Sequence, residues 1–206
     1  MTIALSGCEQ QTVALDQSTD VAINYTVLAL GDSLTEGLGV KESDNYPSIL
    51  QSYLPNNIKV INAGLSGETS TGLKNRLNWV LTQKPDLVIL NIGANDAMRG
   101  LPIDLTTNNI DHIISQIKAS KSQVILAGMQ IYDNLGKKYV NDFNQIFPNL
   151  AQKHQIPLIP FFLKGVAGNP KFNQTDLLHP NAEGYQIIVE KNILPTLNQF
   201  LKDQSL

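Results

Sequence analysis

The sequence lacks the features that would point to a disulfide framework, a nucleic-acid partner or a membrane-spanning helix. Its one cysteine, Cys8, can form neither an intramolecular disulfide nor a cysteine-based metal site. The formal net charge of −3 argues against the basic surface that nucleic-acid-binding domains present. No apolar run reaches the roughly 18 residues that a transmembrane helix needs. What remains is a chain of 206 residues, 42% hydrophobic and 16% charged, which predicts one globular domain.

The segment around Cys8 is similar to a lipidation motif. Leu5-Ser6-Gly7-Cys8 resembles the bacterial lipobox, in which the cysteine is lipidated and becomes the mature N-terminus. The polar stretch Glu9–Asn24 that follows is suited to a tether. We therefore expect residues 1–24 to be an N-terminal tail of a periplasmic or outer-membrane-anchored bacterial lipoprotein, and residues 25–206 to be a single folded domain. The alternative is an incidental cysteine in a frayed N-terminus of a soluble protein.

Strand-like and helix-like segments alternate from Tyr25 onward. The expected strands are short apolar segments: Tyr25–Leu30, Ile58–Ala63, Asp86–Ile92, Gln123–Ala127 and Pro157–Phe162. The expected helices are Asn45–Leu54, Thr69–Thr82, Thr106–Ala119, Lys137–His154 and Asn181–Lys202, and prolines 148 and 195 are expected to kink or divide the last two. This alternation predicts a three-layer α/β/α sandwich around a five-stranded parallel sheet. Right-handed crossovers favour the flavodoxin-like strand order 2-1-3-4-5.

Polar residues without an obvious packing role follow the first three expected strands. Ser33 comes directly after the first strand, Gly67 lies in the loop after the second, and Asn95 follows the third. In the predicted order these strands are neighbours, and their carboxyl ends form the edge at which such sheets bind ligands. Asp176 and His179 precede the closing helix, where a return loop would meet the same edge.

These residue types match the needs of acyl transfer, which requires a nucleophile, a base, an acid that orients the base, and donors for the oxyanion. Ser33 by itself could be a nucleophile or a ligand contact. His179 is the best base of the three histidines, since His154 suits the end of its helix and His112 is expected to face solvent. Asp176 could orient His179.

Each of these residues also has a structural interpretation. Asp176 alone could be a helix cap, and Gly67 and Asn95 could be ordinary turn residues. It is the combination with Ser33 that favours catalysis. The Gly-x-Ser-x-Gly elbow, Walker motif, dinucleotide fingerprint and metal-ligand clusters are absent from the sequence, so we expect no cofactor and no metal.

Four ordered blocks resemble the SGNH or GDSL hydrolase family. They are Gly31-Asp32-Ser33-Leu34, the segment 63–69 around Gly67, Gly93-Ala94-Asn95-Asp96, and Asp176-Leu177-Leu178-His179-Pro180. Segments 93–102, 129–131 and 156–162 resemble the branch of small bacterial arylesterases and the multifunctional thioesterase–lysophospholipase. The resemblance spans about residues 25–200 and implies the SGNH hydrolase fold. It also implies a nucleophile at Ser33, an acid and base at Asp176 and His179, and an oxyanion hole from the backbone N–H groups of Ser33 and Gly67 with the side chain of Asn95.

The sequence thus leads to a working hypothesis and two alternatives. The hypothesis is a serine esterase that hydrolyses aryl or short-chain esters, acyl-CoA or lysophospholipids through an acyl-enzyme on Ser33. We expect a small-molecule substrate, no nucleic-acid partner and a monomer. One alternative is a carbohydrate acetyl esterase with the same site, and the other is a non-catalytic flavodoxin-like binding module. The segment Ile131–Asn134 lacks prolines that relatives often carry, so the acyl-chain preference of the relatives is not transferred.

Overall fold

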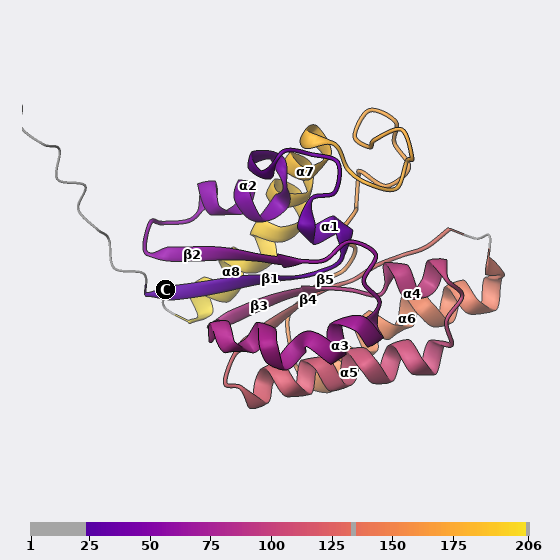
Figure 1. Cartoon of the computed structure of the whole chain (residues 1–206), viewed down its shortest axis with the longest axis horizontal. Coiled ribbons are helices and arrows are strands. Elements are labelled where there is room, and N and C mark those ends of the chain that lie inside the picture. Colours follow the sequence, from indigo (N-terminus) through magenta and orange to yellow (C-terminus); the bar gives the residue numbers. More distant parts are fainter. Residues whose placement is uncertain (1–23, 133–134, 205–206) are drawn as a thin grey trace, which may run out of the picture.

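A five-stranded parallel sheet forms the centre of the molecule (Figure 1). The computed structural model describes residues 24–132 and 135–204, so Cys8 and all of the expected tail except Asn24 lie outside the described residues. The strands are β1 (Tyr25–Gly31), β2 (Ile58–Gly64), β3 (Leu87–Asn91), β4 (Gln123–Ala127) and β5 (Leu158–Ile159). They lie in the order β2-β1-β3-β4-β5, which confirms the predicted topology.

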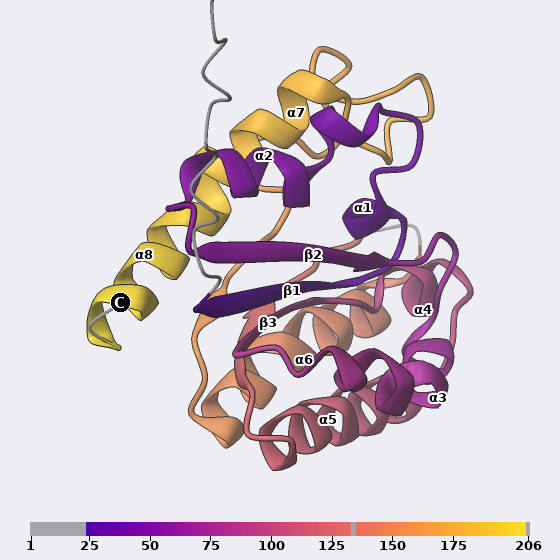
Figure 2. The same ribbon diagram turned by 60° about the vertical axis from the view of Figure 1, so that its left-hand side comes forward.

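Helices cover both faces of the sheet, as the three-layer prediction requires (Figures 1 and 2). One face carries α2 (Tyr46–Tyr53), α7 (Ala182–Ile187) and α8 (Leu194–Asp203), and the other carries α3 (Ser70–Val80), α5 (Ile103–Ala119) and α6 (Lys137–His154). The short elements are α1 (Ser33–Glu36), η1 (Glu42–Asp44), η2 (Leu81–Gln83), α4 (Ala94–Met98) and η4 (Ile188–Ile193).

The core lies between the helices and both faces of the sheet. Every residue of β3 is buried, as expected for a parallel strand covered on two sides. On α5 the predicted isoleucine stripe of Ile110, Ile113, Ile114 and Ile117 is fully buried. The stripe packs α5 against the rest of the core, so burial of this face rather than local helix propensity holds the helix in place.

Helix boundaries differ from the predictions where backbone hydrogen bonding is irregular. The expected closing helix is three successive segments, because the π-helical η4 separates α7 from α8. Pro195 lies in the first turn of α8 and has no N–H to donate to the preceding turn. That preceding turn is the π-helical η4, which is wider than an α-helical turn. In contrast, Pro148 lies inside α6, which runs from Lys137 to His154 undivided. The single-turn helices α1 and α4 are too short to show a hydrophobic period, and the sequence did not predict them.

Glycines at the ends of β1 and β2 bring the chain unusually close to the sheet edge. Gly31 and Gly64 are paired in register. A Cβ atom on Gly31 would lie 2.1 Å from the carbonyl oxygen of Asn91, and one on Gly64 would lie 2.1 Å from the backbone nitrogen of Glu36. Both contacts are with backbone atoms, which cannot move aside as a flexible side chain can. The two glycines therefore allow α1 to begin directly against the carboxyl edge of the sheet.

Candidate active site

Ser33 is the first residue of α1, immediately beyond the carboxyl end of β1. Asp32 is the N-cap of this short helix, and its Oδ1 accepts a hydrogen bond from the backbone N–H of Leu34 at 3.0 Å. The helix ends after one turn at Gly37, which has left-handed φ of 90°. A tight turn at each end thus fixes the orientation of Ser33, whose exposed fraction is 7%.

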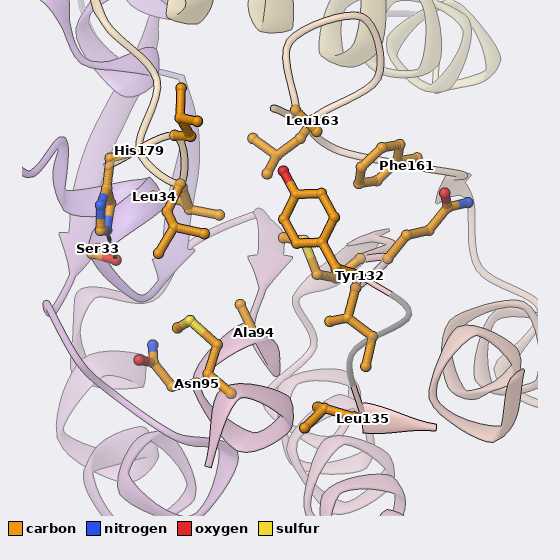
Figure 3. Close-up of a pocket in the computed structure, with 16 residues that line it drawn as sticks. Ser33, Leu34, Ala94, Asn95, Tyr132, Leu135, Phe161, Leu163 and His179 are labelled. Atoms are coloured by element: carbon orange, nitrogen blue, oxygen red, sulfur yellow. Dashed lines mark hydrogen bonds between the residues drawn. The ribbon is translucent and has the colours of Figure 1, made fainter. Parts of the chain in front are cut away.

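The structure brings His179 and Asp176 to Ser33 in one hydrogen-bonded chain. His179 Nε2 lies 2.9 Å from Ser33 Oγ (Figure 3). On the other side of the ring, His179 Nδ1 lies 2.6 Å from Asp176 Oδ2. The carboxylate can only accept, so Nδ1 carries the proton and Nε2 is left to accept from the serine hydroxyl. This is the arrangement of nucleophile, base and orienting acid that acyl transfer uses.

Asp176 is held by hydrogen bonds from the turn that follows it. Its Oδ1 accepts hydrogen bonds from the backbone N–H groups of Leu178 at 2.9 Å and His179 at 3.0 Å. Partial burial raises the pKa of the Asp176 carboxyl, but the hydrogen bonds from the backbone and ring of His179 and from Leu178 more than offset it and lower the pKa to about 2. The carboxylate is therefore charged throughout the neutral range.

Gln174 anchors the loop that carries His179, a role that no sequence pattern predicted. Its backbone N–H donates to the carbonyl of His179 at 2.8 Å. Its side-chain amide donates to the carbonyls of Pro180 at 3.0 Å and Leu38 at 2.7 Å. Gln174 thus joins the loop of the base to the segment that follows the helix of Ser33. A lone glutamine in a loop carries no pattern from which this role could have been read.

Asn95 lies in α4, whose N-cap Gly93 has a left-handed φ of 118°. The Asn95 side chain is 7% exposed, and its Nδ2 lies 3.4 Å from Asp32 Oδ2. The next residue, Asp96, accepts hydrogen bonds from the backbone and hydroxyl of Ser70 at 2.8 and 2.5 Å, which fastens α4 to the start of α3. The structure thereby places Asn95 against the residue that precedes Ser33.

Asp32 is the buried carboxyl beneath this site. Burial raises its pKa, whereas the Leu34 N–H, the nearby imidazole of His179 and the amide of Asn95 lower it, and Glu68 raises it again. The net result is a pKa of about 7 instead of the ordinary 3.8. Asp32 therefore changes charge in a pH range where exposed carboxyls are already ionised.

Gly67 belongs to the loop after β2, which is tied to both β1 and α1. Leu65 donates its N–H to the carbonyl of Gly31 at 3.0 Å, and Ser66 donates to Glu36. Gly67 has left-handed φ of 75°, and its carbonyl accepts from Arg99 at 2.7 Å. Gly67 is not among the residues that line the cavity beside Ser33. Arg99 is a second residue that the sequence analysis missed, and an exposed arginine gives no signal of such a contact.

The loop of Gly67 also rests on a buried ion pair. Arg76 of α3 lies 2.6 Å from the Glu68 carboxylate, whose side chain is 3% exposed. The same guanidinium donates to the carbonyl of Ala63 at 2.8 Å, at the end of β2. Separating the two partners would leave a buried charge uncompensated, so the pair is costly to break. It therefore holds the loop against the sheet edge.

A cavity of about 580 Å³ opens beside Ser33, Asn95 and His179 (Figure 3). Its remaining walls are almost wholly apolar and come from segments that are distant in sequence: Leu34, Ala94, Met98, Met129, Gln130, Ile131, Tyr132, Leu135, Phe161, Leu163, Ala167, Leu177 and Leu178. The arrangement can hold an apolar group against a serine hydroxyl.

The other sequence expectations concern residues away from this site. His154 is the last residue of α6 and His112 is exposed, as expected for both. His154 Nε2 also lies 2.7 Å from Asp111 Oδ1. Within residues 24–132 and 135–204, no group of three or more His, Cys, Asp or Glu side chains could hold a metal ion. No helix in this described part of the chain is long and apolar enough to cross a membrane.

Comparison with known proteins shows the family to which the chain belongs. Residues 29–187 match the model of the GDSL-like lipase/acylhydrolase family. The esterase TesA of Pseudomonas aeruginosa is 34% identical over 97% of this chain and 98% of its own length. Thioesterase 1/protease 1/lysophospholipase L1 of Escherichia coli K12 is 33% identical over 84% of this chain and 85% of its own. A crystal structure of TesA, 33% identical, superposes with a TM-score of 0.81 over 85% of this chain and 99% of that one. The family predicted from the four sequence blocks is thus confirmed, and the chain belongs to the GDSL-like lipase/acylhydrolase family.

Proposed function

We propose that this protein is a serine esterase that hydrolyses carboxylic esters or thioesters through an acyl-enzyme on Ser33. The observation that carries the proposal is the chain of hydrogen bonds from Asp176 through His179 to Ser33, at 2.6 and 2.9 Å, on the wall of an apolar cavity. The names of the relatives, an esterase and a thioesterase/lysophospholipase, support the same class of substrate.

In the proposed reaction, Ser33 Oγ attacks the acyl carbon while His179 Nε2 takes its proton. The proton then passes to the departing alcohol or thiol, and the acyl group remains on Ser33. Water attacks this acyl-enzyme with His179 again as the base, and the carboxylic acid leaves. Asp176 remains an anion throughout, because its pKa of about 2 keeps it charged, and it stabilises the imidazolium that forms twice.

The oxyanion would be bound by the side chain of Asn95 and the backbone N–H groups of Ser33 and Gly67. The contact of Asn95 Nδ2 with Asp32 orients the amide, and the contact of Arg99 with the Gly67 carbonyl fixes the peptide that follows. Donors held in place before the reaction stabilise the developing charge at no cost of reorganisation.

The lining of the cavity favours an apolar acyl group over a sugar. Among the described residues that line the cavity, only Gln130 and Tyr132 have polar side chains besides the proposed catalytic residues. A carbohydrate would leave most of its hydroxyl groups without partners there, and unpaired buried polar groups are costly. We therefore rank hydrolysis of acyl or aryl esters above deacetylation of carbohydrates. A non-catalytic binding module ranks lower still, since it gives no role to the Asp176–His179 pair.

The N-terminal tail is a separate proposal. We infer from the lipobox-like segment that Cys8 carries a diacylglyceryl group and that the chain from Cys8 to Asn24 tethers the hydrolase domain in the bacterial periplasm. Expression from the full gene in a bacterial host should give an intact mass that exceeds the mass of the chain from Cys8 onward by that lipid, and Cys8→Ser should abolish both the lipid and the cleavage before position 8. An unmodified Cys8 in the mature protein would contradict the anchor and leave the esterase proposal intact.

Replacing Ser33 with alanine tests the esterase proposal directly. We expect kcat for p-nitrophenyl acetate to fall by about 10⁴–10⁶, because the acyl-enzyme can no longer form. A fluorophosphonate probe should label the wild-type protein on Ser33 and fail to label the variant. Ser43→Ala, which alters an exposed serine on η1, is the matched control and should keep both activity and labelling. Wild-type rates in the Ser33→Ala protein would refute the assignment.

Replacing Asn95 with alanine tests the oxyanion hole. We expect kcat to fall by about 10²–10³ with little change in KM, since the amide donates to a charge that develops only in the transition state. Asn149→Ala, an exposed position on α6, serves as the control and should behave as wild type. A loss confined to KM would mean that Asn95 binds the ground state instead.

The buried Asp32 predicts a pH-dependent stability. Its folded-state pKa of about 7 lies above the ordinary 3.8, so the folded protein holds this proton more tightly than the unfolded chain. The associated stability is fully present below about pH 4 and is lost as the pH rises through about 7. In urea titrations at pH 4 and 8, wild-type protein should lose more unfolding free energy across this interval than Asp32→Asn. Equal pH dependence of the two proteins would show that Asp32 titrates like an exposed carboxyl.

A further inference from the structure

Leu177 has a backbone conformation that leucine rarely adopts. In the described part of the chain, four non-glycine residues have positive φ: Lys84, Lys121, Gln155 and Leu177. The first three follow the ends of η2, α5 and α6, where a left-handed residue commonly terminates a helix. Leu177, with φ of 59°, lies instead in the loop between Asp176 and His179. The left-handed region is unfavourable for any residue with a Cβ atom, so this leucine is strained.

The geometry of the Asp176–His179 turn requires the left-handed conformation. Leu177 donates its N–H to the carbonyl of Gln174 at 3.0 Å, while the next two N–H groups both donate to Asp176 Oδ1. The chain must therefore reverse at position 177 for the Asp176 carboxylate to meet both the backbone and the ring of His179. Glycine would satisfy this turn without the steric cost of a side chain.

Stability of the fold does not explain why the position holds leucine. The exposed fraction of Leu177 is 41%, and among the described residues it belongs neither to the buried core nor to the apolar side chains packed against it. Leu177 does line the cavity, together with Ser33 and His179. No core contact offsets the strain at Leu177, and the residue lies next to the catalytic groups. This combination indicates that the side chain has a functional role.

We propose that Leu177 is a specificity-determining residue, whose side chain packs against the acyl chain of an ester with a medium-length aliphatic acyl group. This inference rests on the proposed esterase function of Ser33. An acetyl group is too short to use an apolar cavity of about 580 Å³, whereas an octanoyl chain can contact its wall. Leu177 gains apolar contact only with the longer chain, so it raises the preference for octanoyl over acetyl esters.

Two variants at this position separate the side chain from the strain. Leu177→Gly removes both, and Leu177→Ala removes most of the side chain but keeps a Cβ atom in the left-handed region. We expect the ratio of kcat/KM for p-nitrophenyl octanoate to that for p-nitrophenyl acetate to fall about tenfold in both variants. The melting temperature of Leu177→Gly should equal that of the wild type or exceed it by about 2–4 °C, because glycine relieves the strain. Leu177→Ala should show no such increase, because it keeps the Cβ atom.

Gln155→Gly is the matched control. Gln155 has φ of 54° at the end of α6, and it is not among the residues that line the cavity. Relief of strain there should affect the melting temperature without changing the ratio of the two ester activities. A change of the ratio in this control would show that strain relief anywhere alters selectivity, which would overturn the assignment to Leu177.

Other outcomes also decide the matter. An unchanged ester ratio in both Leu177 variants would overturn the proposal, because the side chain would then contribute nothing to acyl binding. A fall of the melting temperature by more than about 4 °C in Leu177→Gly would overturn it as well, because the leucine would then serve the fold. If Ser33→Ala hydrolysed both esters as wild type does, the esterase proposal itself would fail. Wild-type hydrolysis that depends on Ser33, with an unchanged ratio, would reject Leu177 alone.

Discussion

The close approach of backbone to backbone at the carboxyl edge of the sheet is the constraint on which the site depends. Gly31 and Gly64 end neighbouring strands in register, and neither has room for a Cβ atom. Because of this contact, α1 starts against the sheet and Ser33 is held at the edge. The pairing of Gly31 with Asn91 then brings the chain after β3 to the same place, and that chain carries Asn95. The relative positions of serine and asparagine therefore follow from strand register and not from loop flexibility.

Polar contacts around the site hold these residues in a fixed geometry. Asp96 fastens α4 to α3, the Glu68–Arg76 pair fastens the Gly67 loop to β2, and Gln174 fastens the histidine loop to the chain after α1. None of these groups touches the hydroxyl of Ser33. Each one orders a segment that carries a group at the site, as preorganised sites require. The buried Asp32 belongs to the same system, and its raised pKa shows that the site carries an energetic cost in the folded state.

The sequence predicted the framework well because strands, amphipathic helices and strand-end motifs are all local patterns. The five strands, their order and the meeting of Ser33 and Asn95 near one edge follow from periodicity and topology. His179 was predicted to join them from its motif with Asp176 in combination with Ser33, and the structure places it there. The π-helical turn before Pro195 and the one-turn helices α1 and α4 escaped prediction, since single turns have no period. The anchors Gln174 and Arg99 escaped it too, because each contacts carbonyl oxygens that only the folded chain brings close.

The hydrogen-bonded groups of the site and its apolar walls come from different segments of the chain. The hydrogen-bonded groups depend on β1, β3 and the turn before α7, whose conformations are fixed by glycines and buried polar contacts. The apolar walls come mainly from the chain after β3, β4 and β5, including Met98, Ile131 and Phe161, and these side chains hydrogen-bond to nothing in the site. A wall residue can therefore change without disturbing the hydrogen bonds among Asp176, His179 and Ser33. Leu177 is the exception, because its backbone belongs to the turn that orients His179 while its side chain belongs to the wall. A residue with both roles must accept the backbone conformation that the turn imposes, and this explains how a strained leucine can persist in the site.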